Sequence, residues 1–121
     1  MREFTFRIPW TSPPLTSNQR LHWAHKAKIT REVRGLTKVL VRKVPDMDRI
    51  EVSLEWVVNT NHRRDTDNVV PTLKAICDGI VDAEVVPDDT PAYMVKIMPT
   101  IRHVRKRDDV PHFNLTIKEL A

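Results

Sequence analysis

Two pairs of aspartates are the residues of this chain best suited to chemistry. Asp65 and Asp67 lie just before a segment with helical periodicity, and Asp88 and Asp89 follow the same segment. Because a helix and a short loop can return the chain, we expect the two pairs to meet around one point. Mg²⁺ prefers oxygen ligands, and it takes one or two carboxylates together with water and substrate phosphates. Such an ion polarises a phosphoryl oxygen and positions water, so the pattern favours phosphodiester hydrolysis.

Lys74 and Asp78 extend this acidic group. They follow Asp67 at intervals that place all three on one side of a helix beginning near residue 68. A lysine beside a metal–phosphate site stabilises the charge that develops in the transition state. Two simpler interpretations stay open. Lys74 could form an ion pair with an aspartate, or Asp67 and Asn68 could cap the helix while Asp88 and Asp89 form a turn.

Hydrophobic periodicity predicts the elements that position these residues. Alternating side chains indicate strands over residues 4–8, 50–58, 93–97 and 113–117. A 3.6-residue period predicts a basic helix over residues 19–42, capped by Ser17 or Asn18 and loosened at Gly35, and a second helix over 69–83, capped by Asn68 with Pro71 in its first turn. The basic stretch 102–109 is interpreted as hairpin-like. The order β-α-β-α-β-β predicts an α+β (α/β-like) fold: a small mixed β-sheet packed with two main helices.

Length and charge limit the classes of protein to consider. The chain has 121 residues, which predicts a single domain over residues 1–121. Its formal net charge is +4, with residues 1–50 and 99–121 basic and residues 51–98 acidic. A purely electrostatic DNA-binding protein has no use for the acidic block, whereas a metal-dependent nuclease uses both signs. The alternative is that the acidic and basic segments pair with each other in the fold.

Several classes of site are excluded or disfavoured. A single cysteine, Cys77, excludes an intrachain disulfide framework and a multi-cysteine zinc site, and its apolar neighbours place it in the core. With two glycines there is no phosphate-binding Gly-rich loop, so we expect no nucleotide cofactor and a phosphate that belongs to a polymer. No apolar run is long enough to span a bilayer, and the first ten residues lack the features of a signal peptide. We therefore expect no membrane partner and a cytoplasmic location.

An ordered set of motifs resembles the RusA family of Holliday junction resolvases. The set is Arg64-Asp65-Thr66-Asp67-Asn68, then Lys74 to Gly79, then Val86-Pro87-Asp88-Asp89. The resemblance covers residues 50–100 most strongly, and the strand and proline-containing loop of residues 4–18 also look similar. This chain departs from the family pattern in two places. Three more residues separate Asp67 from Lys74, and Glu84 stands where many relatives have Gly.

The resemblance implies a function and a set of site residues. RusA proteins are homodimeric, Mg²⁺-dependent endonucleases, for which Mn²⁺ would be a substitute metal, and they resolve four-way DNA junctions by paired symmetric nicks in recombination and repair. They are common in bacteriophage and prophage genomes, which implies the bacterial or phage-infected cytoplasm, near the nucleoid. Carried over by motif, Asp65, Asp67 and Asp89 would bind the metal with Asp88 beside them, and Lys74 would complete the catalytic set. Asn68 and Asp78 would support these residues.

Basic residues outside the motifs are candidates for DNA contacts, against the alternative of a solvated surface. They are Arg20, Lys26, Lys28, Arg31, Arg63, Arg64, Arg105, Lys106 and Arg107. His22 and His25 are expected to face DNA or solvent rather than a metal, and Trp10, Trp23 and Trp56 are expected to pack. Two rival functions stay open: a nucleic-acid-binding module without catalysis, and a metal-dependent nuclease acting on another branched DNA.

Overall fold

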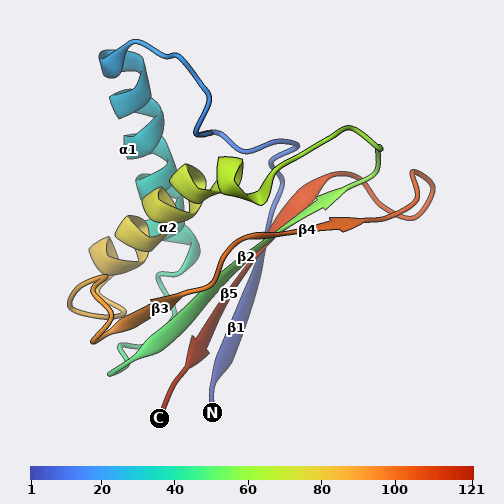
Figure 1. Ribbon diagram of the computed structural model, residues 1–121. Coiled ribbons are helices and arrows are strands. Elements are labelled where there is room, and N and C mark those ends of the chain that lie inside the picture. Colours follow the sequence, from blue (N-terminus) through green and yellow to red (C-terminus); the bar gives the residue numbers. More distant parts are fainter.

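The protein is a two-layer α+β structure, in which both helices cover one face of a five-stranded mixed sheet (Figure 1). The computed structural model describes residues 1–121. Its elements are β1 (Glu3–Ile8), α1 (Trp23–Leu40), β2 (Ile50–Val58), the 3₁₀ turn η1 (Thr66–Val69), α2 (Val70–Asp82), β3 (Met94–Lys96), β4 (Thr100–His103) and β5 (His112–Glu119). The predicted fold class and element order are confirmed, with β4 as one additional strand.

β2 is the strand on which the sheet is built. It pairs antiparallel with β5, which in turn pairs with β1, and it pairs parallel with β3 and β4 on its other side. Ile50, Val52 and Leu54 are fully buried, whereas the intervening Glu51 and Ser53 are half-buried. This alternation explains why one face of the sheet carries the core and the other stays polar.

β3 and β4 form a single interrupted edge beside β2. β3 pairs with the first three residues of β2, and β4 pairs with its last four. Pro99 lies between them and lacks the N–H that a continuous ladder would need. In β3 the buried side chain is Met94, whereas Tyr93 and Ile97 are exposed. Lys96, two residues from Met94, therefore lies on the same face of the strand, toward α2.

The basic stretch 102–109 is not a hairpin, so this part of the prediction was wrong. β4 and β5 do not pair with each other, because β2 lies between them and pairs with both. The segment from Val104 to Pro111 instead passes around the end of β2 (Figure 1). A period-2 pattern indicates strands but does not say which strands are neighbours.

A glycine allows the two helices to approach closely. A Cβ atom added at Gly79 of α2 would lie 2.7 Å from the Thr37 Cβ and 2.8 Å from the Arg34 carbonyl oxygen of α1. Beside this contact, Arg34 donates two hydrogen bonds to the Asp82 carboxylate, at 2.9 and 2.8 Å. α1 runs unbroken through Gly35, so the expected loosening there is absent.

Both predicted helix caps were wrong. α1 begins later than expected, and the His22 side chain caps it by accepting a hydrogen bond from the Ala24 N–H at 3.2 Å. Asn68 lies inside η1, and the residue at the N-cap of α2 is Val69, which makes no side-chain cap. The 3₁₀ turn η1 leads directly into α2, so the Asn68 side chain does not cap the helix. Pro71 lies in the first turn of α2, as predicted.

Candidate functional site

Asp65 and Asp67 lie at the start of the η1–α2 unit, and their carboxylates have no ion-pair partner. Asp65 has extended backbone angles just before η1, and Asp67 lies within the turn. Both side chains are exposed, and neither makes an ion pair. The turn itself is held by the Asn68 N–H, which donates to the Asp65 carbonyl at 3.1 Å, and by the Ser17 hydroxyl, which donates to the Asp67 carbonyl at 3.0 Å. Two free carboxylates are therefore presented on an anchored turn.

The proline-containing loop of residues 9–18 provides that anchor. The buried Thr72 hydroxyl donates to the Leu15 carbonyl at 2.7 Å and accepts from the Leu15 N–H at 3.1 Å. This reciprocal pair fixes the loop against the first turn of α2, beside Ser17. The sequence carried one signal of this contact, which is a threonine on the apolar face of the helix.

Asp89 and Lys96 form a second charged centre at the other acidic pair. The Lys96 ammonium donates to the Asp89 carboxylate at 2.8 Å, and the side chains are about one third and one quarter exposed. This hydrogen bond, with smaller contributions from the charges of Lys96 and Lys74, holds the pKa of Asp89 below its ordinary value, against the opposing effect of burial. The same bond raises the pKa of Lys96. Asp88 makes the turn, because its carboxylate accepts from the Asp89 N–H at 2.8 Å.

Lys74 and Asp78 lie near this pair, around the side chain of Cys77. Burial raises the pKa of the Cys77 thiol to about 12, and the charges of Lys96, Asp78, Asp89 and Lys74 all act on it. Cys77 is fully buried, which confirms its place in the core. Lys74 is exposed and makes no ion pair, so the simpler interpretation of a Lys74–Asp78 or Lys74–Asp67 bridge does not hold.

The two acidic pairs do not meet in one ligand set as the sequence predicted. No group of three or more His, Cys, Asp or Glu side chains is placed to hold a metal ion. The donor chemistry nevertheless fits Mg²⁺ in an open site, because this ion takes one or two carboxylates and fills its remaining positions with water and substrate phosphate. Asp65 and Asp67 would hold such an ion, and Asp89 would join them only by exchanging its Lys96 partner.

Lys96 is the site residue that sequence reasoning missed. Lys96 lies opposite Asp89 only if its face of β3 packs against α2. The alternation of Tyr93, Val95 and Ile97 in the sequence predicted that those apolar residues form the packed face. In the structure Met94 is buried and Tyr93 is exposed, so Lys96 lies on the face that packs against α2. The signal available in the sequence was the Met94–Lys96 spacing, which becomes informative only once the buried face is known.

Most of the predicted DNA-binding residues are free cations at the surface. Those that are exposed and have no acidic partner are Arg20, Lys26, Lys28, Arg31, Arg63, Lys106 and Arg107. Arg105 is exposed but pairs with Asp108 at 2.9 Å.

Arg64 differs from these residues, because its guanidinium is engaged within the protein. It donates to the Thr60 carbonyl and hydroxyl and to the His62 carbonyl, and it lies 5.2 Å from the centre of the Trp56 ring. Arg64 therefore shapes the loop that precedes Asp65.

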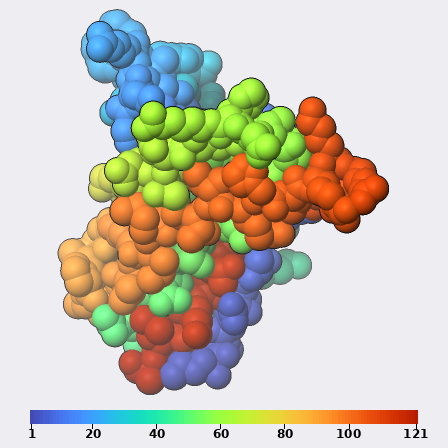
Figure 2. All heavy atoms as spheres, turned by 45° about the vertical axis from the view of Figure 1, so that its right-hand side comes forward, coloured from blue at the N-terminus to red at the C-terminus, as the bar shows by residue number.

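The three tryptophans divide into two packed residues and one exposed residue. Trp10 and Trp56 both pack on Phe113, with ring centres 5.7 and 5.6 Å apart, as predicted. The prediction that Trp23 packs was wrong, because the residue is 77% exposed; its ring lies beside that of His22, with ring centres 5.5 Å apart. It lies where α1 begins, ahead of the point at which the helix reaches the core, and this end stands out from the body of the protein (Figure 2).

Comparisons with known proteins give no family for the chain. No family model matches it. An uncharacterized protein of Xylella fastidiosa (strain Temecula1 / ATCC 700964) is 30% identical over 83 residues, covering 63% of this chain and 54% of that protein. The chain thus spans about half the length of this relative. The crystal structure of the hydrogenase maturation protein HypE aligns with 98% of this chain and 32% of its own, at 14% identity and a TM-score of 0.40, which is too weak to carry an argument. No helix has the length and apolar composition needed to cross a membrane.

Proposed function

We propose that this protein is a Mg²⁺-dependent endodeoxyribonuclease that resolves four-way DNA junctions by paired nicks, in the cytoplasm, in recombination and repair. One observation carries the proposal: Asp65 and Asp67 are exposed and unpaired on an anchored turn at the mouth of α2, the helix that also carries the unpaired Lys74. Neither of these carboxylates nor the Lys74 ammonium has an ion-pair partner within the protein. The RusA-like order of these motifs supports the same function.

Each side chain of the site has a distinct task in this proposal. Asp65 and Asp67 hold and orient the metal, and a Mg²⁺ ion bound there supplies Lewis acidity at a phosphoryl oxygen. The Lys74 ammonium stabilises the negative charge that grows on the phosphoryl oxygens in the transition state. Lys96 holds the Asp89 carboxylate by a hydrogen bond at 2.8 Å, so Asp89 becomes a metal ligand only when this bond is exchanged.

The free basic side chains and the two-fold symmetry of the substrate extend the proposal to partners. The basic face of α1 and the segments around residues 63 and 106 would contact phosphates of the junction arms. A four-way junction that is nicked symmetrically in two strands needs two active sites related by the same symmetry. We therefore propose a homodimer.

A nucleic-acid-binding module without catalysis is the second candidate function. The observation that favours it is the closed Asp89–Lys96 pair, together with the lack of a three-carboxylate group. In that case binding would weaken with salt and need no divalent ion. A nuclease that acts on other branched DNA would use the same residues and differ only in the substrate it cuts.

Substitution of Asp67 separates these candidates. We expect Asp67→Asn to bind a labelled four-way junction as the wild type does when EDTA is present, and to lose cleavage in Mg²⁺ by about 100-fold or more, because it removes one charge from the metal site. Asp48→Asn is the matched control, since Asp48 is an exposed aspartate without an ion pair outside the proposed site. Wild-type cleavage by Asp67→Asn would refute the assignment of the site.

A further inference from the structure

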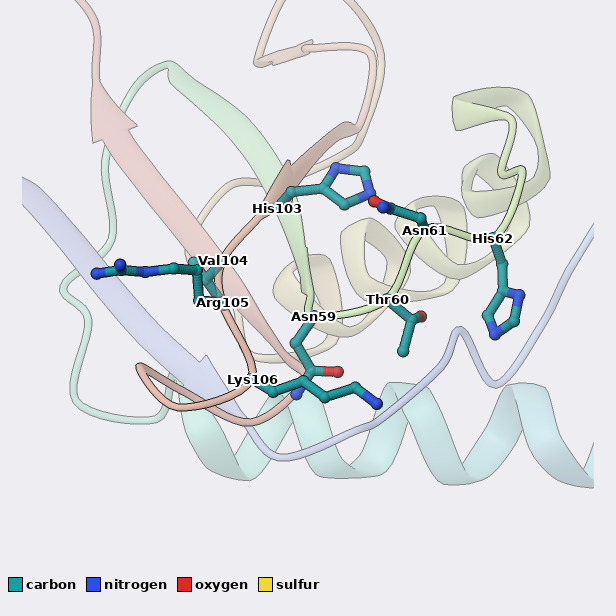
Figure 3. A pocket seen from close by; sticks show the side chains of 8 residues that line it. All are labelled: Asn59, Thr60, Asn61, His62, His103, Val104, Arg105 and Lys106. Atoms are coloured by element: carbon teal, nitrogen blue, oxygen red, sulfur yellow. The ribbon is translucent and has the colours of Figure 1, made fainter.

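A cavity of about 610 Å³ opens where β2 and β4 end (Figure 3). Its lining comes from the segments that follow these two strands: Asn59, Thr60, Asn61 and His62 on one side, and His103, Val104, Arg105 and Lys106 on the other. β2 and β4 are parallel neighbours, so their carboxyl ends lie side by side. The carboxyl ends of adjacent parallel strands are a common place for ligands to bind.

Hydrogen bonds fix both walls of this cavity. The Val104 N–H donates to the Val58 carbonyl at 2.9 Å, which joins the second wall to the end of β2. On the first wall, Arg64 bonds the Thr60 and His62 carbonyls. The Asn59 side-chain amide donates to the Asp109 carbonyl at 3.2 Å, which joins the first wall to the segment that follows the second wall. The cavity is therefore formed before any ligand arrives, which lowers the cost of binding.

The chemistry of the lining suits an anion. Seven of its eight residues are polar or charged, and none is an aspartate or glutamate. Lys106 has no acidic partner, and His62 and His103 are exposed. Figure 3 shows the His103 ring beside the Asn61 amide, and the Lys106 side chain extending below Thr60. Arg105 extends away from this group, and its guanidinium is paired with Asp108 at 2.9 Å.

We infer that this cavity binds phosphate groups of a nucleic-acid strand on their way to the candidate carboxylates, an inference that rests on the proposed function and adds a strand-binding site to it. The donors lie on two walls of an open hollow, which suits successive phosphates of a polymer better than a single enclosed anion. The segment after β2 and the segment after β4 lie against each other at the surface (Figure 2). Lys106, His62 and His103 are the phosphate contacts in this inference.

The short segment between His62 and Asp65 limits the distance between the cavity and the candidate carboxylates. His62 precedes Asp65 by three residues, which is at most about 10 Å of extended chain. Duplex DNA rises about 3.4 Å per nucleotide of one strand, so this span corresponds to roughly three nucleotides. If the cavity binds one phosphate of a strand, another phosphate a few nucleotides along the same strand would therefore lie at Asp65 and Asp67.

Two substitutions that each remove one lysine charge test the inference. Lys106→Gln removes an ammonium that faces the cavity, and Lys118→Gln removes one from an exposed position of β5 that has no ion pair and lies outside the cavity. In fluorescence anisotropy with a labelled four-way junction in EDTA, we expect Lys106→Gln to raise Kd about tenfold and to reduce the slope of log Kd against log salt by about one. Lys118→Gln should raise Kd less than about threefold, because only screened, longer-range attraction is lost. Equal effects of the two variants would overturn the inference.

A second variant and a competitor complete the test. Lys106→Glu should weaken binding further than Lys106→Gln, since it places a carboxylate against phosphate, and circular dichroism confirms that each variant is folded. Inorganic phosphate at about millimolar concentration and constant ionic strength should not displace the junction, because multiple contacts favour the polymer. Displacement by phosphate at that concentration would indicate a site for a small anion and overturn the inference.

These measurements distinguish this inference from the proposed function. If the protein cuts no DNA in Mg²⁺ but the two variants differ in EDTA as expected, the nuclease proposal fails and the strand site stands. If the junction is cut in Mg²⁺ while Lys106→Gln and Lys118→Gln bind equally, the nuclease proposal stands and the strand site fails.

Discussion

At the scale of single residues, Glu84 has a backbone that its side chain does not favour. Its φ of 64° is the only positive φ in the protein. The Glu84 N–H donates to the Val81 carbonyl at 2.8 Å and the Val85 N–H to the Ile80 carbonyl at 3.4 Å, which is the Schellman pattern that ends a helix with a left-handed residue. Glycine adopts this left-handed backbone without the steric cost that a side chain brings.

Replacing Glu84 with glycine should therefore stabilise the protein. We expect Glu84→Gly to raise the free energy of unfolding by about 1 kcal/mol, because glycine adopts this backbone region without steric cost. Lys38→Gly, in the helical and exposed part of α1, is the control and should lower the free energy of unfolding by a similar amount. Urea denaturation measures both, and a less stable Glu84→Gly would contradict the left-handed cap.

The Asp89–Lys96 bond makes a prediction about pH. The folded-state pKa of Asp89 is lowered, so the pair stabilises the protein above the ordinary aspartate pKa of about 3.9, and this contribution is lost as pH falls through the folded-state pKa. We expect Lys96→Met to raise the pKa of Asp89 toward its ordinary value, measured by NMR titration of the carboxyl carbon. It should cost at most about 1 kcal/mol at pH 7, because the pair is partly exposed.

The matched control for this prediction is Lys118→Met, at an exposed lysine of β5 without an ion pair. It should leave the pKa of Asp89 unchanged. An Asp89 pKa that does not move in Lys96→Met would show that the bond between the two residues is absent in solution.

At the scale of elements, the contact between α1 and α2 depends on Gly79. We expect Gly79→Ala to lower the free energy of unfolding by about 1–3 kcal/mol, since the new methyl group would overlap Thr37 and the Arg34 carbonyl and push the helices apart. Gly35→Ala should instead raise it by about 0.5–1 kcal/mol, because nothing lies within 4 Å of an added Cβ there and alanine is the better helix former. Thermal denaturation compares the two, and changes of the same sign would contradict this packing.

Periodicity predicted the elements well where a whole face is apolar, and poorly where a boundary depends on a tertiary contact. The buried alternation of β2 and the apolar face of α2 were both apparent from the sequence, and both elements are confirmed. The helix starts were misplaced because His22 and the turn η1 do what Ser17 and Asn68 were expected to do. The hairpin was wrong because strand order is set by pairing partners that the local pattern does not contain.

At the scale of the whole molecule, the charge blocks do not cancel in the fold. Of the acidic block 51–98, Glu55 and Asp82 pair with cations of the basic blocks, and Asp89 pairs within its own block. Asp65, Asp67 and Asp88 make no ion pair. Mutual pairing therefore accounts for only part of the acidic block, and the carboxylates it leaves free include those the proposed function uses.

Only part of the candidate site could be predicted from the sequence. The aspartates and Lys74 are recognisable because their types and spacing lie within one helix and its two flanking loops. Lys96 and the cavity could not be predicted, since they depend on the face that β3 turns toward α2 and on the parallel pairing of β4 with β2. These features arise only when segments distant in the sequence meet.

The measurement that tests the central claim most directly is cleavage of a labelled synthetic four-way junction beside a linear duplex of the same sequence, in Mg²⁺ and in EDTA. We predict paired symmetric nicks in the junction alone and only in Mg²⁺, because the free carboxylates need a divalent ion to act on a phosphodiester. Binding without any cut in Mg²⁺ or Mn²⁺ would contradict the claim. The protein would then be a binding module, and its free aspartates would be features of a turn and a helix start.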